Sequence, residues 1–276
     1  MMAALQARLE RTSSTRSAAL LRIGLALLLW ERFGNFYVPF AYTLDPLRLL
    51  LSVPFWVFTA CMLVGYRAQL ATASTAIVLL VSWFSLGVFG DIGDFIHHHT
   101  WLMVLATVWL AFTPCGTSLS VDRWFAVRDA TRNDAPIPLE EGPDWGLLLI
   151  ALQVSAVYWW GAWDKTSWPF LSGDRLSMLV MHQYTGFRVT GWAFDLIMAF
   201  GAWAVVIVEY ALPFGLFVRR WQPFATVAGI ALHAVIYLTL PVGPFSAVML
   251  LLYLAYYHPD DIHQGIETLL GRPPSP

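Results

Sequence analysis

Long apolar runs recur along the whole chain, separated by shorter polar stretches. They cover approximately residues 18–38, 47–65, 69–90, 98–114, 144–163, 192–217, 221–240 and 243–258. A membrane helix needs about 20 apolar residues to cross a hydrocarbon core about 30 Å thick, and backbone inside lipid must satisfy its own hydrogen bonds. Barrel strands would alternate apolar and polar residues, which these runs do not. The pattern predicts an all-α, polytopic bundle of about eight transmembrane helices, forming a single domain over residues 1–276. The first run, which contains Arg22, and the short last run give the weakest signals.

Positively charged residues divide unevenly between the two sides of this bundle. One side collects eleven cations: Arg8, Arg11, Arg16, Arg22, Arg67, Arg123, Arg128, Arg132, Arg219, Arg220 and Arg272. The other side collects five: Arg32, Arg48, Lys165, Arg175 and Arg188. Cytoplasmic connections of membrane proteins carry the excess of Lys and Arg. We therefore expect both termini to be cytoplasmic in a multi-pass protein of the cell membrane.

Two connections are long enough to carry structure of their own. The cytoplasmic loop 115–143 begins with a predicted interfacial helix from Ser118 to Ala130, with apolar residues Leu119, Trp124 and Phe125. The extracytoplasmic loop 164–191 is too polar to span the membrane and too rich in aromatic residues for a plain linker. We expect this second loop to pack back against the bundle.

The composition agrees with a membrane setting and argues against one class of partner. Of 276 residues, 58% are hydrophobic and 12% are charged, whereas soluble domains carry roughly 25% charged residues. The formal net charge of −2 argues against nucleic acid as a partner. Cys61 and Cys115 fall in or beside apolar runs, so we expect small core residues rather than a disulfide.

Lys165 is the single lysine of the chain, against 15 arginines. An amine differs from a guanidinium because burial can turn an amine into a base. Lys165 lies at the predicted extracytoplasmic end of the fifth span. It is either a lysine that extends to the interface beside Asp164 or a base sheltered from water.

Histidines and aspartates gather at the mouth of the fourth span, in residues 91–99 (DIGDFIHHH). Adjacent helical residues point about 100° apart, so three successive histidines cannot face one ion. We therefore expect a hydrogen-bonding or pH-sensitive mouth rather than a metal site. The charge count places this mouth on the same side as Lys165.

Two ionisable residues, Glu209 and His233, lie inside apolar spans. Ionisable groups inside a membrane are costly and usually mark functional interiors. His233 can equally be a neutral core histidine that donates to a backbone carbonyl. Tyr158 on the fifth span is expected to make a hydrogen bond between helices.

Three short stretches, in order along the chain, suggest a family. The first is 98–102 (HHTWL) followed by 120–122 (SVD), and the second is 158–165 (YWWGAWDK) followed by Trp168 and Gly173. The third is Glu209, then His233, then 243–246 (GPFS). Together they resemble the vitamin K-dependent γ-carboxylase family and its bacterial relatives, the HTTM (horizontally transferred transmembrane) domain proteins. The resemblance covers nearly the whole chain, and the ordered set is more specific than any single motif.

The resemblance implies a quinol-dependent site at the extracytoplasmic face of the membrane. Lys165 matches the family's catalytic base, which deprotonates reduced vitamin K, and His233 matches a histidine of the reaction chamber. The quinone would be bordered by His98, His99, Trp163 and Trp168. The implied cofactor is reduced vitamin K or another menaquinol-type quinol, with O2 and CO2 as co-substrates that carboxylate a glutamate. The quinol would reach this site laterally from the lipid bilayer.

The resemblance leaves the acceptor open. Animal carboxylases continue past the helices into a large extracytoplasmic region that helps to bind substrate, whereas this sequence ends at Pro276. We therefore expect another acceptor, a peptide or protein substrate held by a separate substrate-binding subunit, or loss of carboxylation. Two alternatives are a non-catalytic membrane partner in peptide maturation or export, and a quinone-binding redox subunit.

Overall fold

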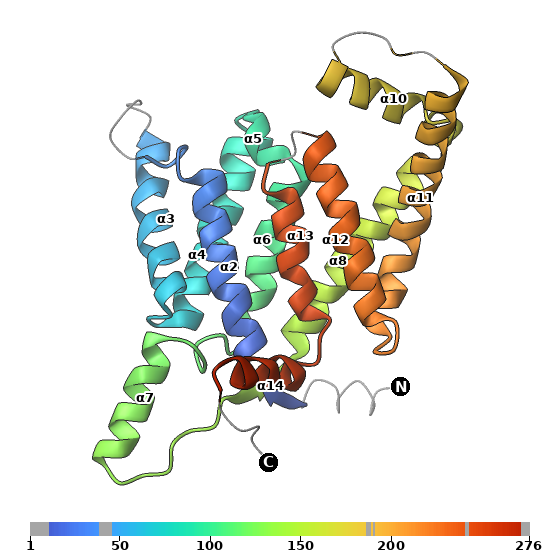
Figure 1. The fold of residues 1–276 in the computed structure, drawn as a ribbon. Coiled ribbons are helices and arrows are strands. Elements are labelled where there is room, and N and C mark those ends of the chain that lie inside the picture. Colours follow the sequence, from blue (N-terminus) through green and yellow to red (C-terminus); the bar gives the residue numbers. More distant parts are fainter. Residues whose placement is uncertain (1–10, 39–45, 186–188, 190, 241–242, 272–276) are drawn as a thin grey trace, which may run out of the picture. The chain divides into compact units, whose positions relative to one another are not determined.

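Helices dominate the computed structural model of the chain, which describes residues 11–38, 46–185, 189, 191–240 and 243–271 (Figure 1). Each apolar run of the sequence coincides with one helix, so the predicted all-α class is confirmed. These helices are α2 (Arg16–Phe33), α3 (Pro46–Val64), α4 (Ala68–Ser82, continued by the π-helical η1, Trp83–Val88), α6 (His98–Ala111), α8 (Trp145–Lys165), α11 (Trp192–Phe217), α12 (Gln222–Thr239) and α13 (Phe245–Leu252, continued by the 3-10 turn η3, Tyr253–Ala255).

The described part of the chain contains four helical segments long and apolar enough to cross a membrane. They are Ala68–Val88, Trp145–Lys165, Trp192–Phe217 and Gln222–Thr239. Three shorter apolar helices cover Leu50–Val64, His99–Ala111 and Phe245–Ala255. The protein is thus a helical membrane protein, whereas the number of eight crossings and the cytoplasmic termini stay predictions.

The chain divides into two compact units: unit 1 is Met1–Ala151 with Leu254–Pro276, and unit 2 is Leu152–Tyr253. In unit 1, α3 packs on α4, and α2 and α6 pack against this pair. Arg22 explains the weak signal of the first span: it is fully buried, and its guanidinium donates to the carbonyl oxygens of Met62 (3.1 Å) and Leu119 (2.6 Å). Carbonyl partners of this kind offset part of the cost of burying a charge.

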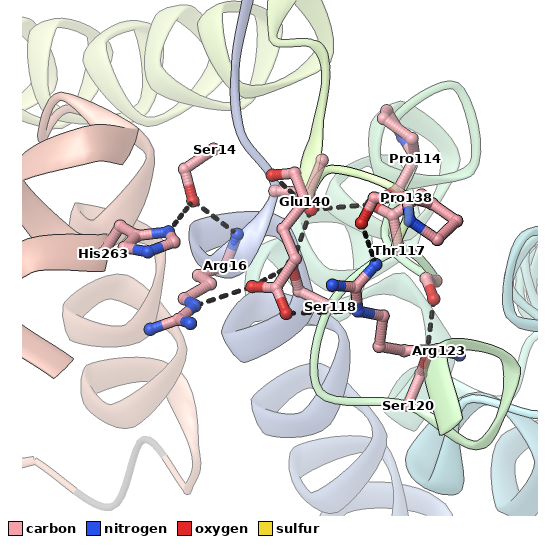
Figure 2. Close-up of polar contacts among 12 residues, drawn as sticks. Ser14, Arg16, Pro114, Thr117, Ser118, Ser120, Arg123, Pro138, Glu140 and His263 are labelled. Carbon is pink, nitrogen blue, oxygen red and sulfur yellow. Dashed lines mark hydrogen bonds and ion pairs between the residues drawn. The ribbon is translucent and has the colours of Figure 1, made fainter. Parts of the chain in front are cut away.

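Unit 1 also contains two features that the apolar pattern did not predict. Strand β1 (Thr12–Ser14) pairs antiparallel with β2 (Glu141–Pro143). Helix α14 (Pro259–Leu269) contacts both β1 and the N-terminal end of α2 (Figure 1). Arg16 joins these parts, because its guanidinium pairs with Glu140 at 2.8 Å (Figure 2) and also with Glu267 of α14. We call Arg16, Glu140 and Glu267 the terminal clasp.

The loop 115–143 contains a helix close to the predicted range, α7 (Val121–Arg132), and its interfacial position stays a prediction. The side chain of Ser120 accepts from the Arg123 amide and caps α7. Asp122 caps α4 instead, because its carboxylate accepts from the amides of Arg67 and Ala68, both at 2.7 Å. The SVD stretch therefore has a structural role, in agreement with the preference for Ser and Asp at helix N-termini. A short helix, α5 (Gly93–Ile96), precedes α6.

The described helices of the loop 164–191 pack on α11 in unit 2. They are α9 (Trp168–Leu171) and α10 (Asp174–Val180), both of which contact α11, and the π-helical η2 (Met181–Thr185) follows α10. Phe170 is buried against Ala202 and Val206. Gly173 has a φ of +86°, and a Cβ there would lie 2.5 Å from the Ala199 amide nitrogen. Only glycine fits this turn and this approach to the helix.

Candidate functional site

Lys165 is the last residue of α8, and its amine is held by α11. The Nζ atom donates to both carboxylate oxygens of Glu209, each at 3.0 Å, and to the carbonyl oxygen of Gly161 at 3.2 Å. The Lys165 side chain is 30% exposed and that of Glu209 is 7% exposed. The single lysine of the chain is therefore a partly sheltered, ion-paired amine whose carboxylate partner comes from another helix.

The ion pair lies deep along α11. Glu209 comes 17 residues after Trp192 and eight residues before Phe217, the two ends of this helix. At 1.5 Å per residue, the pair is about 25 Å from the first end and about 12 Å from the second. The sequence predicts Lys165 at the extracytoplasmic end of the fifth span. In the structure α8 ends partway along α11, and the segment with Phe170 and Gly173 packs on α11 between Glu209 and Trp192.

The absence of a side chain at Gly161 leaves space for the Lys165 amine. A Cβ at this position would lie 3.3 Å from Lys165 Nζ and 3.7 Å from a Glu209 carboxylate oxygen. The first distance is tighter than an ordinary van der Waals contact. A larger side chain here would therefore push the amine away from its carboxylate partner.

A second polar group surrounds His233, which is buried in α12. The Tyr158 hydroxyl contacts His233 Nε2 at 2.6 Å and also bonds to the Tyr253 hydroxyl. On the other side of the ring, Nδ1 lies 3.4 Å from the Ser246 hydroxyl, which donates to the His233 carbonyl oxygen at 3.2 Å. All four side chains are buried, so their hydrogen bonds must be satisfied within the protein.

The contacts around His233 link both ring nitrogens to hydroxyl groups. The Ser246 hydroxyl donates to the His233 carbonyl oxygen and can accept from Nδ1 when that nitrogen carries the proton. At the other nitrogen, Nε2 bonds to the Tyr158 hydroxyl, which also bonds to the Tyr253 hydroxyl. Tyr253, Tyr158 and His233 thus form a hydrogen-bond relay, in which the roles of donor and acceptor depend on the His233 tautomer.

Tyr158 and Lys165 lie on the same face of α8. Seven residues separate them, which is two helical turns or about 10.5 Å, and Gly161 lies between them. We call these three residues the α8 polar face. It presents an amine, beside a carboxylate, and a phenol, beside an imidazole, among apolar helices of unit 2. Such groups can exchange protons with a substrate, and removal of water strengthens each of their interactions.

The other predicted site residues lie elsewhere. Trp163 and Trp168 are 65% and 76% exposed, so neither is packed into unit 2. His99 is half-buried on α6 of unit 1, and its ring stacks on that of His97 with centroids 5.2 Å apart. His98 begins α6, but its side chain lies outside the described residues. The structure thus brings Lys165 to Glu209 and His233 to Tyr158, whereas a shared quinone site with His98 and His99 stays a prediction.

Metal binding at the histidine mouth has no support among the side chains that the structure describes. No group of three His, Cys, Asp or Glu residues is placed there, or elsewhere in the described chain, to hold an ion. The side chain of Asp94, like that of His98, is outside that description.

The sequence pointed to Lys165 and His233 but not to the residues that bond to them. Glu209 was recognised without being paired with Lys165, Tyr253 was not recognised, and no contact was predicted for Ser246. The seven-residue spacing of Tyr158 and Lys165 was the available signal, because it places both on one helix face.

One comparison with known proteins found a matching protein family. A family model described as HTTM domain matches residues 31–260. This range includes the α8 polar face, Glu209, His233, Ser246 and Tyr253. No curated protein and no solved structure matches the chain.

Proposed function

The chain belongs to the HTTM domain family, and from this membership we propose that it is a quinol-dependent membrane enzyme of the vitamin K-dependent carboxylase type. The observation that carries the proposal is the ion pair of Lys165 with Glu209, held at depth beside the Tyr158–His233 relay. A general base must be positioned and kept from bulk water to act on a weak acid. The position of the Lys165 amine against Glu209 and its partial shelter from solvent support this role.

Glu209 gives Lys165 a route to the neutral amine that a base requires. Transfer of one ammonium proton to the carboxylate converts the pair into an amine and a carboxylic acid. The amine can then accept a proton from a substrate hydroxyl and become an ammonium again, so the net proton resides on Glu209. Glu209 is in this proposal a positioning residue and a proton store, and Lys165 is the catalytic base.

The last turns of α8 offer apolar surface to a lipophilic quinol. Trp159, Trp160 and Trp163 are exposed there, and indole rings provide a surface on which an aromatic ring can stack. When bound, reduced vitamin K or another menaquinol-type quinol would supply an acidic hydroxyl and, with O2, the strong base that allows CO2 to add to a glutamate. The described residues provide the proton acceptor for that hydroxyl.

His233 has the role of holding Tyr158 in this proposal. Its Nε2 atom bonds to the Tyr158 hydroxyl, and the Tyr253 hydroxyl bonds to the same group. The relay could also receive a proton from the site. The acceptor substrate is proposed to be a peptide or protein, presented directly or by a separate subunit, at the membrane of the cell.

The direct test supplies purified protein with reduced vitamin K, O2 and labelled bicarbonate and measures quinone epoxide and fixed label. We expect Lys165→Ala to lower epoxide formation at least about a hundredfold. Lys165→Arg is the matched variant, because it keeps a cation beside Glu209 but removes the base, and we expect the same loss. Full epoxide turnover in either variant would remove Lys165 from the mechanism. Epoxide without fixed label would indicate base chemistry that lacks its acceptor.

The same variants separate the enzyme from a non-catalytic membrane partner. A partner in peptide maturation or export would retain its function in Lys165→Arg. It would lose function when the loop 115–143 or the loop 164–191 is changed. A quinone-binding redox subunit would instead carry quinone through purification and form no oxygen-dependent product.

A further inference from the structure

Gly229 is a buried glycine in the middle of α12, one helical turn before His233. Glycine in a helix interior is less favourable than alanine, so a buried glycine there usually has a reason in packing or function. Residues four apart lie on the same face of a helix. The space beside Gly229 is therefore on the face of α12 that carries the His233 imidazole.

The phenol of Tyr253 occupies this space. Tyr253 directly follows α13, which packs against α12, and its side chain is buried. A Cβ at Gly229 would lie 2.0 Å from the Tyr253 hydroxyl oxygen and 2.7 Å and 2.8 Å from the ring atoms Cζ and Cε2. Real Cβ atoms essentially never approach another atom closer than 3.0 Å. Even a methyl group at this position would therefore displace the Tyr253 ring.

We propose that Gly229 is a positioning residue, which admits the Tyr253 phenol to the relay and thereby helps to hold the Tyr158 hydroxyl beside His233. The Tyr253 hydroxyl bonds to that of Tyr158, which bonds to His233 Nε2 at 2.6 Å. A displaced Tyr253 ring would lose its bond to Tyr158. One of the bonds that orient the Tyr158 hydroxyl would then be missing.

The effect of Gly229 on catalysis rests on the proposed quinol-dependent function, whereas its effect on the hydrogen bonds of the relay does not. In that function Tyr158 belongs to the α8 polar face together with Lys165. Small displacements of groups in an active site can lower a rate strongly. A loss of order at Tyr158 should therefore slow the reaction without removal of the base.

The first experiment follows the Tyr158 hydroxyl by NMR in the full chain, purified in detergent. Tyrosine is labelled at Cζ with the NMR-active carbon isotope, and the signals are assigned by their loss in Tyr158→Phe and in Tyr253→Phe. We expect the Tyr158 signal to shift in Gly229→Ala and, in the same direction, in Tyr253→Phe, because both variants remove the same hydrogen bond. An unchanged Tyr158 signal in Gly229→Ala would overturn the proposal.

Gly201→Ala is the matched control, because it makes the same substitution in a neighbouring long helix of unit 2. A Cβ at Gly201 would lie 3.1 Å from a terminal carbon of Leu176, which is the flexible end of a side chain and can move aside. We expect the Tyr158 signal to keep its position in this variant. An equal shift in Gly201→Ala would overturn the assignment of the effect to Gly229.

A shorter side chain at position 253 tests the steric conflict and keeps the proposal testable where Gly229→Ala folds poorly. Tyr253→Leu lacks the ring atoms that the new methyl group would meet. Gly229→Ala should therefore lower the Tm in the unmodified chain and leave it nearly unchanged in the Tyr253→Leu chain. Equal losses in both backgrounds would overturn Tyr253 as the residue that Gly229 admits.

Epoxide formation from reduced vitamin K measures the effect on catalysis. We expect Gly229→Ala and Tyr253→Phe each to lower the rate roughly tenfold, the effect of one orienting hydrogen bond, and Gly201→Ala to leave it unchanged. A shifted Tyr158 signal with an unchanged rate in Gly229→Ala would overturn its role in catalysis. If the unmodified chain forms no epoxide, the proposed function fails, and the NMR result still decides whether Gly229 positions the relay.

Discussion

Lys165 and Glu209 compensate each other's charge in an ion pair that joins α8 to α11. The carboxylate is largely buried, and the amine supplies its only cation among the described ion pairs of unit 2. Removal of one member of a buried pair leaves an uncompensated charge, whereas replacement of both by apolar residues is often neutral.

This dependence predicts a particular pattern of stability. Lys165→Met should destabilise the folded protein by about 2 kcal/mol, a value below that of a fully buried pair because the lysine is partly exposed. The double variant Lys165→Met/Glu209→Leu should recover most of this loss. Thermal unfolding in detergent of the wild type, both single variants and the double variant measures the coupling. Strictly additive effects would contradict an energetic role for the ion pair.

At the residue scale, the sequence identified Lys165 and His233 but could not pair them. Composition singled out Lys165, and an apolar surrounding singled out Glu209 and His233. The Lys165–Glu209 contact joins residues 44 positions apart, and the Tyr158–Tyr253 contact joins residues 95 apart. Contacts at such separations follow from how helices cross, which a single sequence does not encode locally.

At the scale of elements, the terminal clasp fixes α14 to the start of α2. Burial lowers the pKa of Arg16, but its hydrogen bonds to Glu140 and Glu267 outweigh this and raise the pKa above the usual value. Arg16 therefore remains charged and compensates two carboxylates that are themselves largely buried. Loss of the guanidinium would leave these two negative charges close together.

Arg16→Met should therefore release α14. We expect its amides, residues 259–269, to exchange with deuterium roughly thirtyfold faster, which corresponds to a local loss of about 2 kcal/mol. Hydrogen-exchange mass spectrometry measures this directly. Asp129→Asn is the control, because it breaks an exposed pair with Arg128, and such pairs contribute little. Unchanged exchange in Arg16→Met would show that apolar contacts alone hold α14.

Hydrophobic runs predicted the long helices well and the remaining elements poorly. Membrane helices leave a long signal, whereas the three-residue strands β1 and β2 carry no recognisable alternation. Helix α14 had a signal that went unused: Pro259 at its first position and acidic residues Asp260 and Asp261 in its first turn, which are typical of a helix N-terminus.

At the scale of the whole molecule, the predicted orientation can be tested by thiol labelling. Cys61 and Cys115 are replaced by alanine, and a single cysteine is placed at Asn133 or at Asp174, both exposed positions. A membrane-impermeant maleimide should label Asp174→Cys in intact cells and Asn133→Cys only after the membrane is opened. The reverse pattern would invert the predicted arrangement of the loops and termini.

The depth of Glu209 along α11 has an electrical consequence. In a cell membrane that carries a voltage, an elementary charge that crosses the whole bilayer changes in energy by about 2.3 kcal/mol per 100 mV. A proton that leaves the pair toward the nearer end of a membrane-crossing α11 traverses roughly a third of that field. The free energy of releasing this proton would then shift by about 0.8 kcal/mol per 100 mV. The membrane voltage that respiration generates would therefore favour or oppose proton release from this ion pair.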